Sequence, residues 1–294
     1  MKSILDEQKK WADNKGLHYD KEAYCDSFQS NLFIPLDGDD RKSFEEGSGS
    51  ELKDKKGEKA KMKALISSSA LCVNFFLYLK RNGLLPSFME TIGIHNVSIV
   101  GAEFEKKLKT GASNAKANLD FYIECNDCII GIESKFTEHY NKEHGPLKQS
   151  YLEKKNKWQL NDNYSKPFPH LAKWINNWEI GEYYDKKAEK TYTGRFSSFE
   201  YLDVAQLIKH LFALNNDNDV KRPYTLLYIY YYTPCEEIDK HDVELKEFRS
   251  ILEKDNIRFI SVPYQSIFAK LKETLRNHTD YLDYMESRYF SNSI

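Results

Sequence analysis

The sequence predicts an α/β fold, with a central mixed sheet flanked by helices, from three features. Two runs rich in Ile, Phe and Tyr flank Asn126-Asp127, a pattern that predicts a β-hairpin over residues 117–136. An apolar run with helical spacing precedes the hairpin at 70–81. An amphipathic helix at 201–214 leads into 224–232, a run of β-formers without polar alternation that is typical of a buried central strand.

Composition is that of an ordinary globular protein. The 294 residues are 40% hydrophobic and 30% charged, so the chain can form one large domain or a domain with appendages. No apolar run approaches the roughly 18–20 residues that a membrane span needs, and the N-terminus lacks the apolar stretch of a signal peptide. Five cysteines without a regular framework favour a reducing compartment. We therefore expect a cytoplasmic protein without a membrane partner.

The N-terminal part differs in character from the rest. Residues 1–36 mix charged residues with scattered aromatics, which predicts one or two helices on the outside of the core. Residues 37–62 are almost wholly charged or Gly and Ser, so they are not expected to bury enough apolar area to offset their ordering entropy. We expect 1–63 to be an N-terminal extension that includes a mobile connection, and 64–294 to be the main domain.

The first helix of the main domain has recognisable boundaries. Ser67-Ser68-Ser69 supplies N-cap candidates, and Asn82-Gly83 supplies a C-cap. Within the apolar run, Asn74 is either a boundary residue facing solvent or a polar contact near a site. A strand is expected next at 96–106, with Glu103 and Glu105 on one face.

The hairpin register decides which of its charged residues meet. With Asn126-Asp127 as the loop, Asp120 lies directly opposite Glu133, with Cβ atoms about 4.5–5.5 Å apart. Lys135 is two residues further on and shares that face. Facing carboxylates repel, but a divalent cation between them reverses the sign of the interaction. The sequence therefore favours a metal site here over an exposed hairpin face that merely carries charges.

An insertion at about 140–199 separates the hairpin from the second helix. It holds three of the four tryptophans, and residues 141–195 contain 11 Lys and Arg against 7 Asp and Glu. Basic residues interleaved with aromatics suit nucleic acid, because lysine neutralises phosphate and aromatic faces stack on bases. The alternative is a partly helical subdomain that packs its own aromatics. The candidate contacts across the chain are Lys116, Lys148, Lys155, Trp158 and His210.

The remaining elements complete the core. In the helix at 201–214, Leu207, Leu211 and Leu214 form the side expected to face the sheet, while Gln206 and His210 lie one above the other at its edge. Helices are then expected at 239–254 and 263–275, with a short strand between them at 257–262.

Several motifs together resemble a known nuclease superfamily. Asp120 followed by Glu133-Ser134-Lys135 resembles the active-site signature of the PD-(D/E)XK nucleases, with Leu119 in place of the name-giving proline. A larger set of motifs resembles a family of bacterial restriction endonucleases within this superfamily. These motifs are Gly49-Ser50-Glu51-Leu52, Ser67-Ser68-Ser69-Ala70-Leu71 with Asn74, Leu119-Asp120, Glu133-Ser134-Lys135-Phe136-Thr137-Glu138 and Gln206-Leu207-Ile208-Lys209-His210. The resemblance implies a restriction-endonuclease-like α-β-β-β-α-β core over about 64–262, carrying the N-terminal extension and a helical, aromatic insertion.

The resemblance also implies an activity, namely Mg²⁺-dependent hydrolysis of phosphodiester bonds in DNA, with Mn²⁺ able to substitute. Carried over to this sequence, Asp120, Glu133 and the carbonyl of Ser134 become metal ligands. Lys135 becomes the catalytic lysine, which orients the attacking water or steadies charge on the phosphate.

Further roles follow from the resemblance less directly. Gln206 matches a glutamine that contributes to the site in some relatives, whereas His210 stands where a tyrosine is usual. Many relatives carry an acidic residue on the first helix, but residues 64–82 have none, so Glu103 or Glu105 is the substitute to test.

Two other readings remain open on the sequence. One is a nuclease-fold module that binds nucleic acid without turnover, and the other is a nuclease acting on RNA or branched DNA. The net charge of −2 gives no global nucleic-acid signal, and the target site, a modification partner and homodimer formation are left open.

Overall fold

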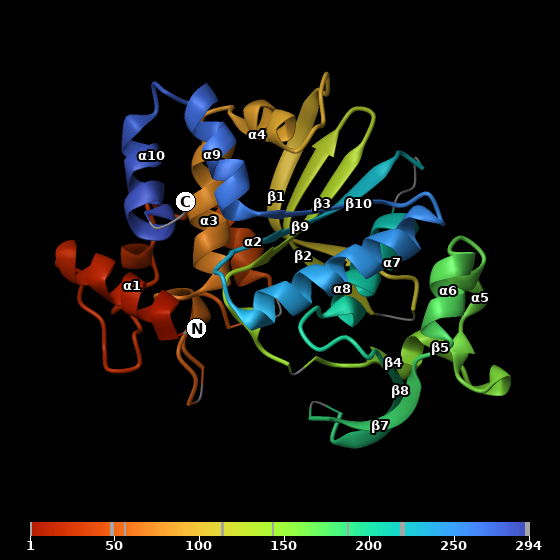
Figure 1. Cartoon of the computed structure of the whole chain (residues 1–294). Coiled ribbons are helices and arrows are strands. Elements are labelled where there is room, and N and C mark those ends of the chain that lie inside the picture. Colours follow the sequence, from red (N-terminus) through yellow and green to blue (C-terminus); the bar gives the residue numbers. More distant parts are fainter. Residues whose placement is uncertain are drawn as a thin grey trace.

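A five-stranded mixed sheet forms the centre of the molecule. The computed structural model describes residues 2–47, 50–55, 57–112, 115–142, 144–186, 188–217 and 221–291. The strands lie in the order β1 (Ile99–Lys109), β2 (Lys116–Cys125), β3 (Ile129–Lys135), β9 (Tyr224–Tyr230) and β10 (Arg258–Pro263) (Figure 1). β1, β2 and β3 form an antiparallel meander, while β3, β9 and β10 are parallel. The predicted mixed sheet is confirmed.

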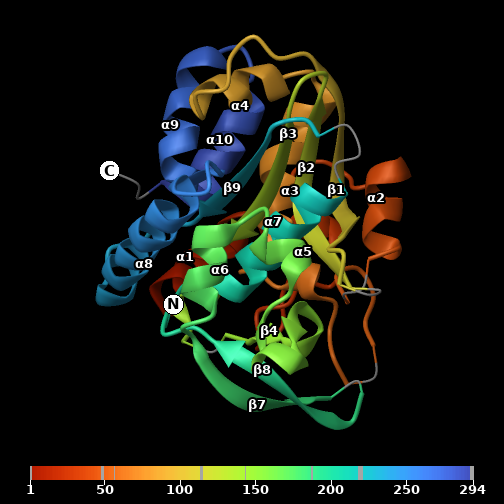
Figure 2. The same ribbon diagram turned by 90° about the vertical axis from the view of Figure 1, so that its right-hand side faces the viewer.

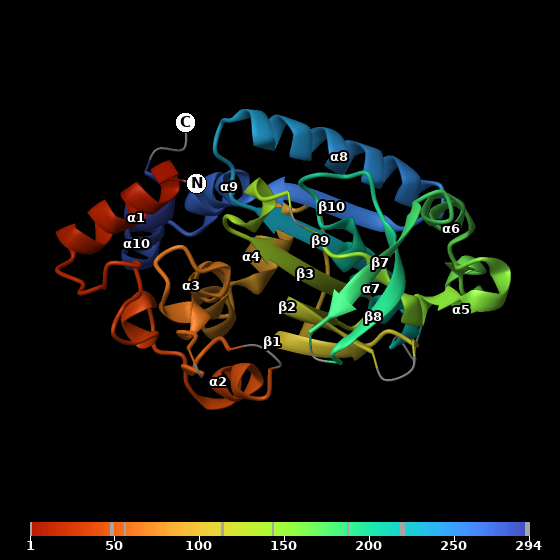
Figure 3. The ribbon, with the colours of Figure 1, turned by 90° about the horizontal axis from the view of Figure 1, so that it is seen from below.

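Helices cover both faces of this sheet, as Figure 3 shows from below. One face carries α3 (Ser68–Arg81), α4 (Leu85–Thr91) and α9 (Tyr264–Thr274). The other carries α7 (Val204–Asn216) and α8 (Glu236–Glu253). Behind α3 lie α10 (Thr279–Met285) and a π-helical turn at Glu286–Phe290, which the polar and aromatic tail of the sequence did not predict.

The hairpin register is the one expected. Phe121 pairs with Ile132 and Glu124 with Ile129, so Asn126-Asp127 is the loop. Gly131 on β3 lets α7 approach closely, because a Cβ there would lie 2.9 Å from Leu119 Cδ1 and 3.0 Å from Leu214 Cδ1. The apolar side of α7 packs on the sheet at this point.

The N-terminal segment differs from the expected extension and connection. It contains α1 (Lys2–Asn14) and α2 (Gly38–Glu45), and the few apolar residues of 37–62 are inserted into the main core, among them Phe44, Leu52 and Met62. Because each of these isolated side chains reaches an apolar neighbour, a largely polar stretch still packs. Gly49 of the quoted motif lies outside the described residues.

Two buried polar residues fasten this segment to the rest of the chain. The Asn74 side chain accepts from Phe33 N at 2.7 Å and donates to Asn31 O at 3.1 Å. Arg288 donates to Asn31 O at 2.8 Å, and its guanidinium lies 4.3 Å from the ring centroid of Trp11. Both expectations for Asn74 were therefore wrong, because it is 3% exposed and bonds the N-terminal segment rather than solvent or a site.

The insertion contains more strand than the expected helical insertion. Its elements are Glu138–Tyr140 (a 3-10 turn), β4 (Leu147–Lys148), β5 (Leu152–Glu153), β6 (Gln159–Leu160), α5 (Asp162–Ser165), α6 (Pro169–Ile175), β7 (Glu179–Asp185) and β8 (Lys190–Phe196). β4, β8 and β7 form a three-stranded sheet. The Thr-Tyr-Thr run of β8 and the two tyrosines and one isoleucine of β7 favour strands. Part of the aromatic content packs internally, since the Tyr164 ring stacks on Phe212 of α7 at 4.1 Å.

Among the described residues, no helix combines the length and the apolar character that crossing a bilayer requires.

Candidate active site

The predicted site residues meet in a hollow of about 380 Å³ at the end of β3, beside the first turns of α3 and α7. Ser67 caps α3 by accepting from Ala70 N, and Asp203 caps α7 by accepting from Gln206 N. These caps fix where each helix begins. The hollow is lined by five acidic residues, Glu51, Glu105, Asp120, Glu133 and Glu138, and by the basic residues Lys61 and Lys135.

Three neighbouring strands align three of these carboxylates. The pairs Phe104–Phe121 and Lys106–Leu119 on β1 and β2 put Glu105 opposite Asp120. The β2–β3 register puts Glu133 beyond Asp120. Glu105 has φ +52°, a left-handed conformation that is uncommon for residues other than glycine. Glu105 lines the hollow, whereas the exposed carboxylate of Glu103 pairs with Lys106 at 2.7 Å.

Asp120 is held in place by the backbone of the facing strand. Its Oδ2 accepts from Ser134 N at 2.7 Å. Burial, and after it the charge of Glu133, raise the pKa of Asp120 well above its usual value. Two carboxylates in this position cannot both carry a charge cheaply unless a cation joins them.

Glu133 and Lys135 form a buried ion pair that Gln206 extends. Lys135 Nζ lies 2.6 Å from Glu133 Oε1 and donates to Gln206 Oε1 at 2.8 Å. Burial acts to raise the pKa of Glu133, but Lys135 and His210 outweigh it and lower this pKa to about 2. Burial acts to lower the pKa of Lys135, and the charge of Glu133 outweighs it and raises that pKa. Glu133 and Lys135 are therefore both charged at neutral pH.

His210 does not contact solvent, so its prediction as a nucleic-acid contact was wrong. Its Nε2 lies 2.8 Å from Glu133 Oε2, and the side chain is 3% exposed. Neither of these two atoms makes a hydrogen bond with good geometry among the described residues. The row of Gln206 and His210 turns inward because α7 packs closely over Gly131. Within this row, the His210 ring faces the Glu133 carboxylate instead of lying at the edge of the helix.

Two acidic residues of the hollow were not assigned a role from the sequence. Glu51 accepts from Lys61 Nζ at 3.0 Å and from Ser69 Oγ at 2.7 Å. Glu138 accepts from the backbone N–H groups of residues 136 and 137 and from the Ser68 hydroxyl. Glu51 and Glu138 both lie within the sequence motifs quoted above. Nothing in their spacing linked them to the carboxylates of the hairpin.

The pKa of Glu105 lies close to neutrality. Burial raises its pKa to about 7, against a hydrogen bond from Asn118 that acts in the opposite direction. The charges of Glu51 and Glu133 contribute further to the increase.

The donor set of the hollow fits a hard divalent cation. Mg²⁺ is usually held by one or two carboxylates and keeps several waters, so Asp120, Glu133 and the Ser134 carbonyl are a sufficient protein share. No group of three or more His, Cys, Asp or Glu side chains within the described ranges is arranged to hold a metal by itself. The backbone carbonyl and water are therefore needed to complete such a site.

The predicted nucleic-acid contacts are spread over the molecule. Lys116 is exposed at the start of β2, and Lys155 is exposed in the insertion. Lys148 is paired with Asp185 at 3.0 Å. Trp158 is half-buried and packs against the core. The structure does not gather these side chains in the hollow.

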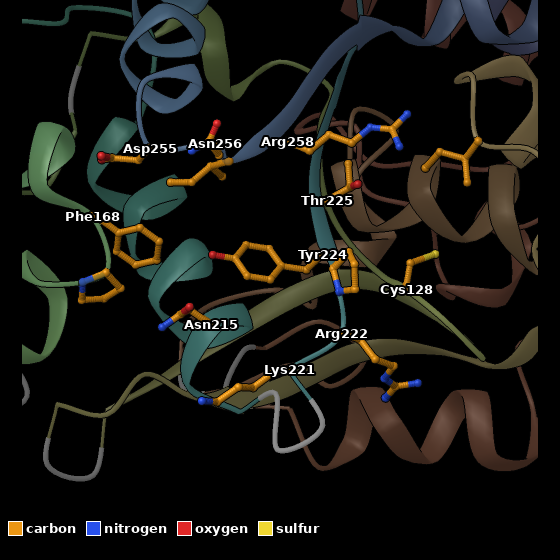
Figure 4. A pocket seen from close by; sticks show the side chains of 14 residues that line it. Cys128, Phe168, Asn215, Lys221, Arg222, Tyr224, Thr225, Asp255, Asn256 and Arg258 are labelled. Carbon is orange, nitrogen blue, oxygen red and sulfur yellow. The ribbon is translucent and has the colours of Figure 1, made fainter.

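A second hollow, of about 430 Å³, lies near the hairpin loop, at the end of the sheet opposite Lys135 (Figure 4). Tyr224 and Phe168 line it, and Arg258 is at its rim. The acidic residue in its lining is Asp255, whose carboxylate already accepts from His170 and from Leu171 N at 2.8 Å. It therefore lacks the paired carboxylates of the first hollow.

The chain matches a known protein family. Residues 5–290 match the family described as Restriction Endonuclease associating with ARP. No curated protein and no solved structure matches the chain. The match spans almost the whole chain, including the N-terminal segment and the insertion.

Proposed function

Because the chain belongs to the family of restriction endonucleases associating with ARP, we propose that it is a Mg²⁺-dependent endonuclease that hydrolyses phosphodiester bonds in DNA. The observation that carries the proposal is the hollow in which Asp120, Glu133 and Lys135 meet. The order of α3, β1, β2, β3, α7 and β9 supports assigning a restriction-endonuclease-like core to this part of the chain.

Within this proposal, Asp120, Glu133 and the Ser134 carbonyl would hold the cation. The bound ion supplies Lewis-acid chemistry, which draws electron density from the scissile phosphate and makes water a better nucleophile. The Ser134 N–H keeps Asp120 turned toward the hollow. Because Ser134 both donates to Asp120 and offers its carbonyl, the end of β3 sets the geometry of the whole ligand group.

Lys135 is the residue that we assign to charge stabilisation. Its ammonium group stays protonated because Glu133 lies 2.6 Å away, and it can offset charge on a phosphate oxygen or hold an attacking water. Gln206 fixes the other side of this ammonium group from α7. The three side chains reach the hollow from two elements that pack rigidly together, which limits how far the lysine can move.

The proposal is tested by cleavage of supercoiled plasmid and of linear DNA with Mg²⁺, with Ca²⁺ and with chelator. We expect cutting with Mg²⁺ or Mn²⁺ and no cutting with chelator. Ca²⁺ should support binding alone, since it accepts looser shells at longer distances. Lys135→Ala should lose turnover but keep most of the metal affinity, because lysine is not a ligand. Lys246→Ala, an exposed lysine on α8, is the matched control and should cut like wild type.

The outcomes separate the alternatives. Equal background cutting by wild type and Lys135→Ala would reject the catalytic assignment. Binding without cutting of any substrate would favour the nucleic-acid-binding module. Single-stranded RNA, duplex RNA and four-way DNA junctions belong in the same assay, because preferential cutting of one of them would move the substrate class away from duplex DNA.

A further inference from the structure

A two-stranded ribbon projects from the insertion. β7 and β8 pair along their whole length, from Glu179 opposite Phe196 to Asp185 opposite Lys190. The ribbon extends below the main body and lies in front of α7 when the molecule is seen from below (Figures 2 and 3). Beyond its pairing with the short strand β4, it belongs to neither face of the central sheet.

The base of the ribbon is fixed by one buried arginine. Arg195 donates to the carbonyls of Trp158, Asn176 and Trp178 at 2.7–2.8 Å. Three charge-assisted bonds to backbone hold the start of the ribbon at a set angle. The base of the ribbon is therefore fixed to the rest of the insertion.

One face of the ribbon is filled by its own side chains. The rings of Tyr183 and Tyr192 stack with centroids 6.0 Å apart, and Lys148 Nζ lies over Tyr183. Near the base, a Cβ on Gly194 would lie 3.0 Å from Leu147 O, so β4 closes this face there. The opposite face is buried at the base, where Arg195 lies opposite Ile180, but its residues toward the tip are more exposed than Tyr183 and Tyr192.

We call this opposite face the open face, and its residues alternate with the packed ones. The register places Glu182 opposite Thr193, and Tyr184 opposite Thr191, with Ile180 in the same row. Ile180 and Tyr184 are 46% and 60% exposed, and they are two of the four most exposed large hydrophobic residues in the part of the chain that the structure describes. Nothing in the described fold covers them.

The chemistry of the open face fits the edges of base pairs. A two-stranded ribbon fits the major groove, which is about 12 Å wide. There, Thr side chains contact bases or the thymine methyl group, and a glutamate accepts from the cytosine amino group. Lys186 and Lys190 are exposed near the tip, where they can reach phosphates beside the groove.

The base of the ribbon also adjoins the proposed active site through α7. Burial lowers the pKa of Lys209 on α7. Smaller contributions to this pKa come from Lys148, which lies against the ribbon, and from Glu133 and Lys135 in the hollow. Both groups of charges are thus within electrostatic range of one helix residue.

We propose that the open face of the β7–β8 ribbon enters the major groove of duplex DNA and determines which sequence the protein prefers. This inference rests on the proposed nuclease function, but it concerns recognition and can be measured without cleavage. Glu182 and Tyr184 are the specificity-determining residues in this assignment.

The test is selection of bound duplexes from a randomised DNA pool in the presence of chelator, followed by sequencing. Wild type should enrich a defined sequence. Glu182→Ala should lose discrimination at a cytosine-containing position, and Tyr184→Ala should lose it at a neighbouring position. Each loss should be about 5- to 150-fold, the effect of removing one base contact. Binding to unselected DNA should change less than threefold, because phosphate contacts supply most of it.

Matched variants keep the test decisive. Glu247→Ala, an exposed glutamate on α8, should enrich the same sequence as wild type. Thr191→Ala provides a third open-face variant in case a larger truncation unfolds the ribbon, and thermal melting checks the fold of each variant. Enrichment of one sequence by wild type and all open-face variants alike would overturn the inference, as would no enrichment by wild type. Failure to cut with normal enrichment would instead overturn only the nuclease proposal.

Discussion

Replacing Asp120 by Asn should stabilise the metal-free protein while removing its response to Mg²⁺. Asp120 and Glu133 face each other across β2 and β3, and two negative charges about 5 Å apart repel by about 3 kcal/mol at an effective dielectric constant of 20. Lys135, beside Glu133, cancels part of this repulsion. An asparagine can still accept from Ser134 N, so the existing hydrogen bond is kept. We expect a net gain of about 1–2 kcal/mol.

The expected shift in melting temperature follows from the size of the chain. At about 2–4 °C per kcal/mol, Asp120→Asn should melt about 2–8 °C higher than wild type in chelator. In excess Mg²⁺ the difference in melting temperature should shrink or reverse, because ligand at 100 times its Kd adds about 2.7 kcal/mol of stability to wild type alone. Differential scanning fluorimetry with chelator and with Mg²⁺ measures both quantities.

The pH dependence of the melting temperature tests whether the charge of Asp120 is the cause of the difference. The pKa of Asp120 is raised in the folded state, so its charge penalises folding only above the ordinary aspartate pKa of about 3.9. The advantage of Asp120→Asn should therefore grow from pH 4 upward and disappear below it. Asp283→Asn, an exposed residue on α10, is the control and should move the melting temperature little. A variant that melts below wild type in chelator, or that still gains stability from Mg²⁺, would refute the reasoning.

Four further predictions follow from single contacts. Gln206→Ala should lower kcat about tenfold with little change in KM, because it frees the ammonium group of Lys135 during turnover. Gly131→Ala should destabilise the fold by about 1–3 kcal/mol in urea unfolding, since its new Cβ has no room beneath α7. Arg288→Met should loosen the N-terminal segment, detected as faster proteolysis within residues 15–35, because buried acceptors lose their donor. Glu105→Gln should flatten the rise of metal affinity through about pH 7, where this carboxyl loses its proton in wild type.

Each of these has an outcome that would contradict it. Unchanged kcat in the Gln206 variant would mean that Lys135 is positioned by Glu133 alone. A Gly131 variant as stable as wild type would show that α7 can shift without loss. Wild-type proteolysis in the Arg288 variant would place the anchoring elsewhere. Metal affinity that still rises through pH 7 in the Glu105 variant would assign that titration to another group.

The hairpin could be predicted because its information is local. Two residues fixed the loop, and the alternation of strands then placed Asp120 and Glu133 together without knowledge of the rest of the fold. The choice between Glu103 and Glu105 could not be made in this way. Strand alternation puts both residues on one face, whereas the left-handed conformation of Glu105 breaks the alternation in the folded chain.

Long-range contacts account for what the sequence did not reveal. Glu51 lies in a run of polar residues, and its place in the hollow depends on Ser69 and Lys61, to which no periodicity links it. The burial of His210 depends on how closely α7 approaches the sheet at Gly131. Asn74 bonds a segment more than 40 residues away. Such pairings arise from tertiary packing, which single-sequence patterns do not contain.

The hydrogen bonds between Arg288 and the N-terminal segment, which we call the clamp, have a consequence for folding during synthesis. Gln8 accepts from a side chain 280 residues later, and ribosomes add about 5–20 residues per second. Roughly 15–60 s therefore pass between the synthesis of Gln8 and the synthesis of Arg288. Glu51 and Lys61, which follow in the same part of the chain, line the hollow. Nascent chains stalled before residue 280 should thus be open to protease near Asn31 and unable to bind Mg²⁺ with full affinity. If they are as resistant as the complete chain, the segment folds without the clamp.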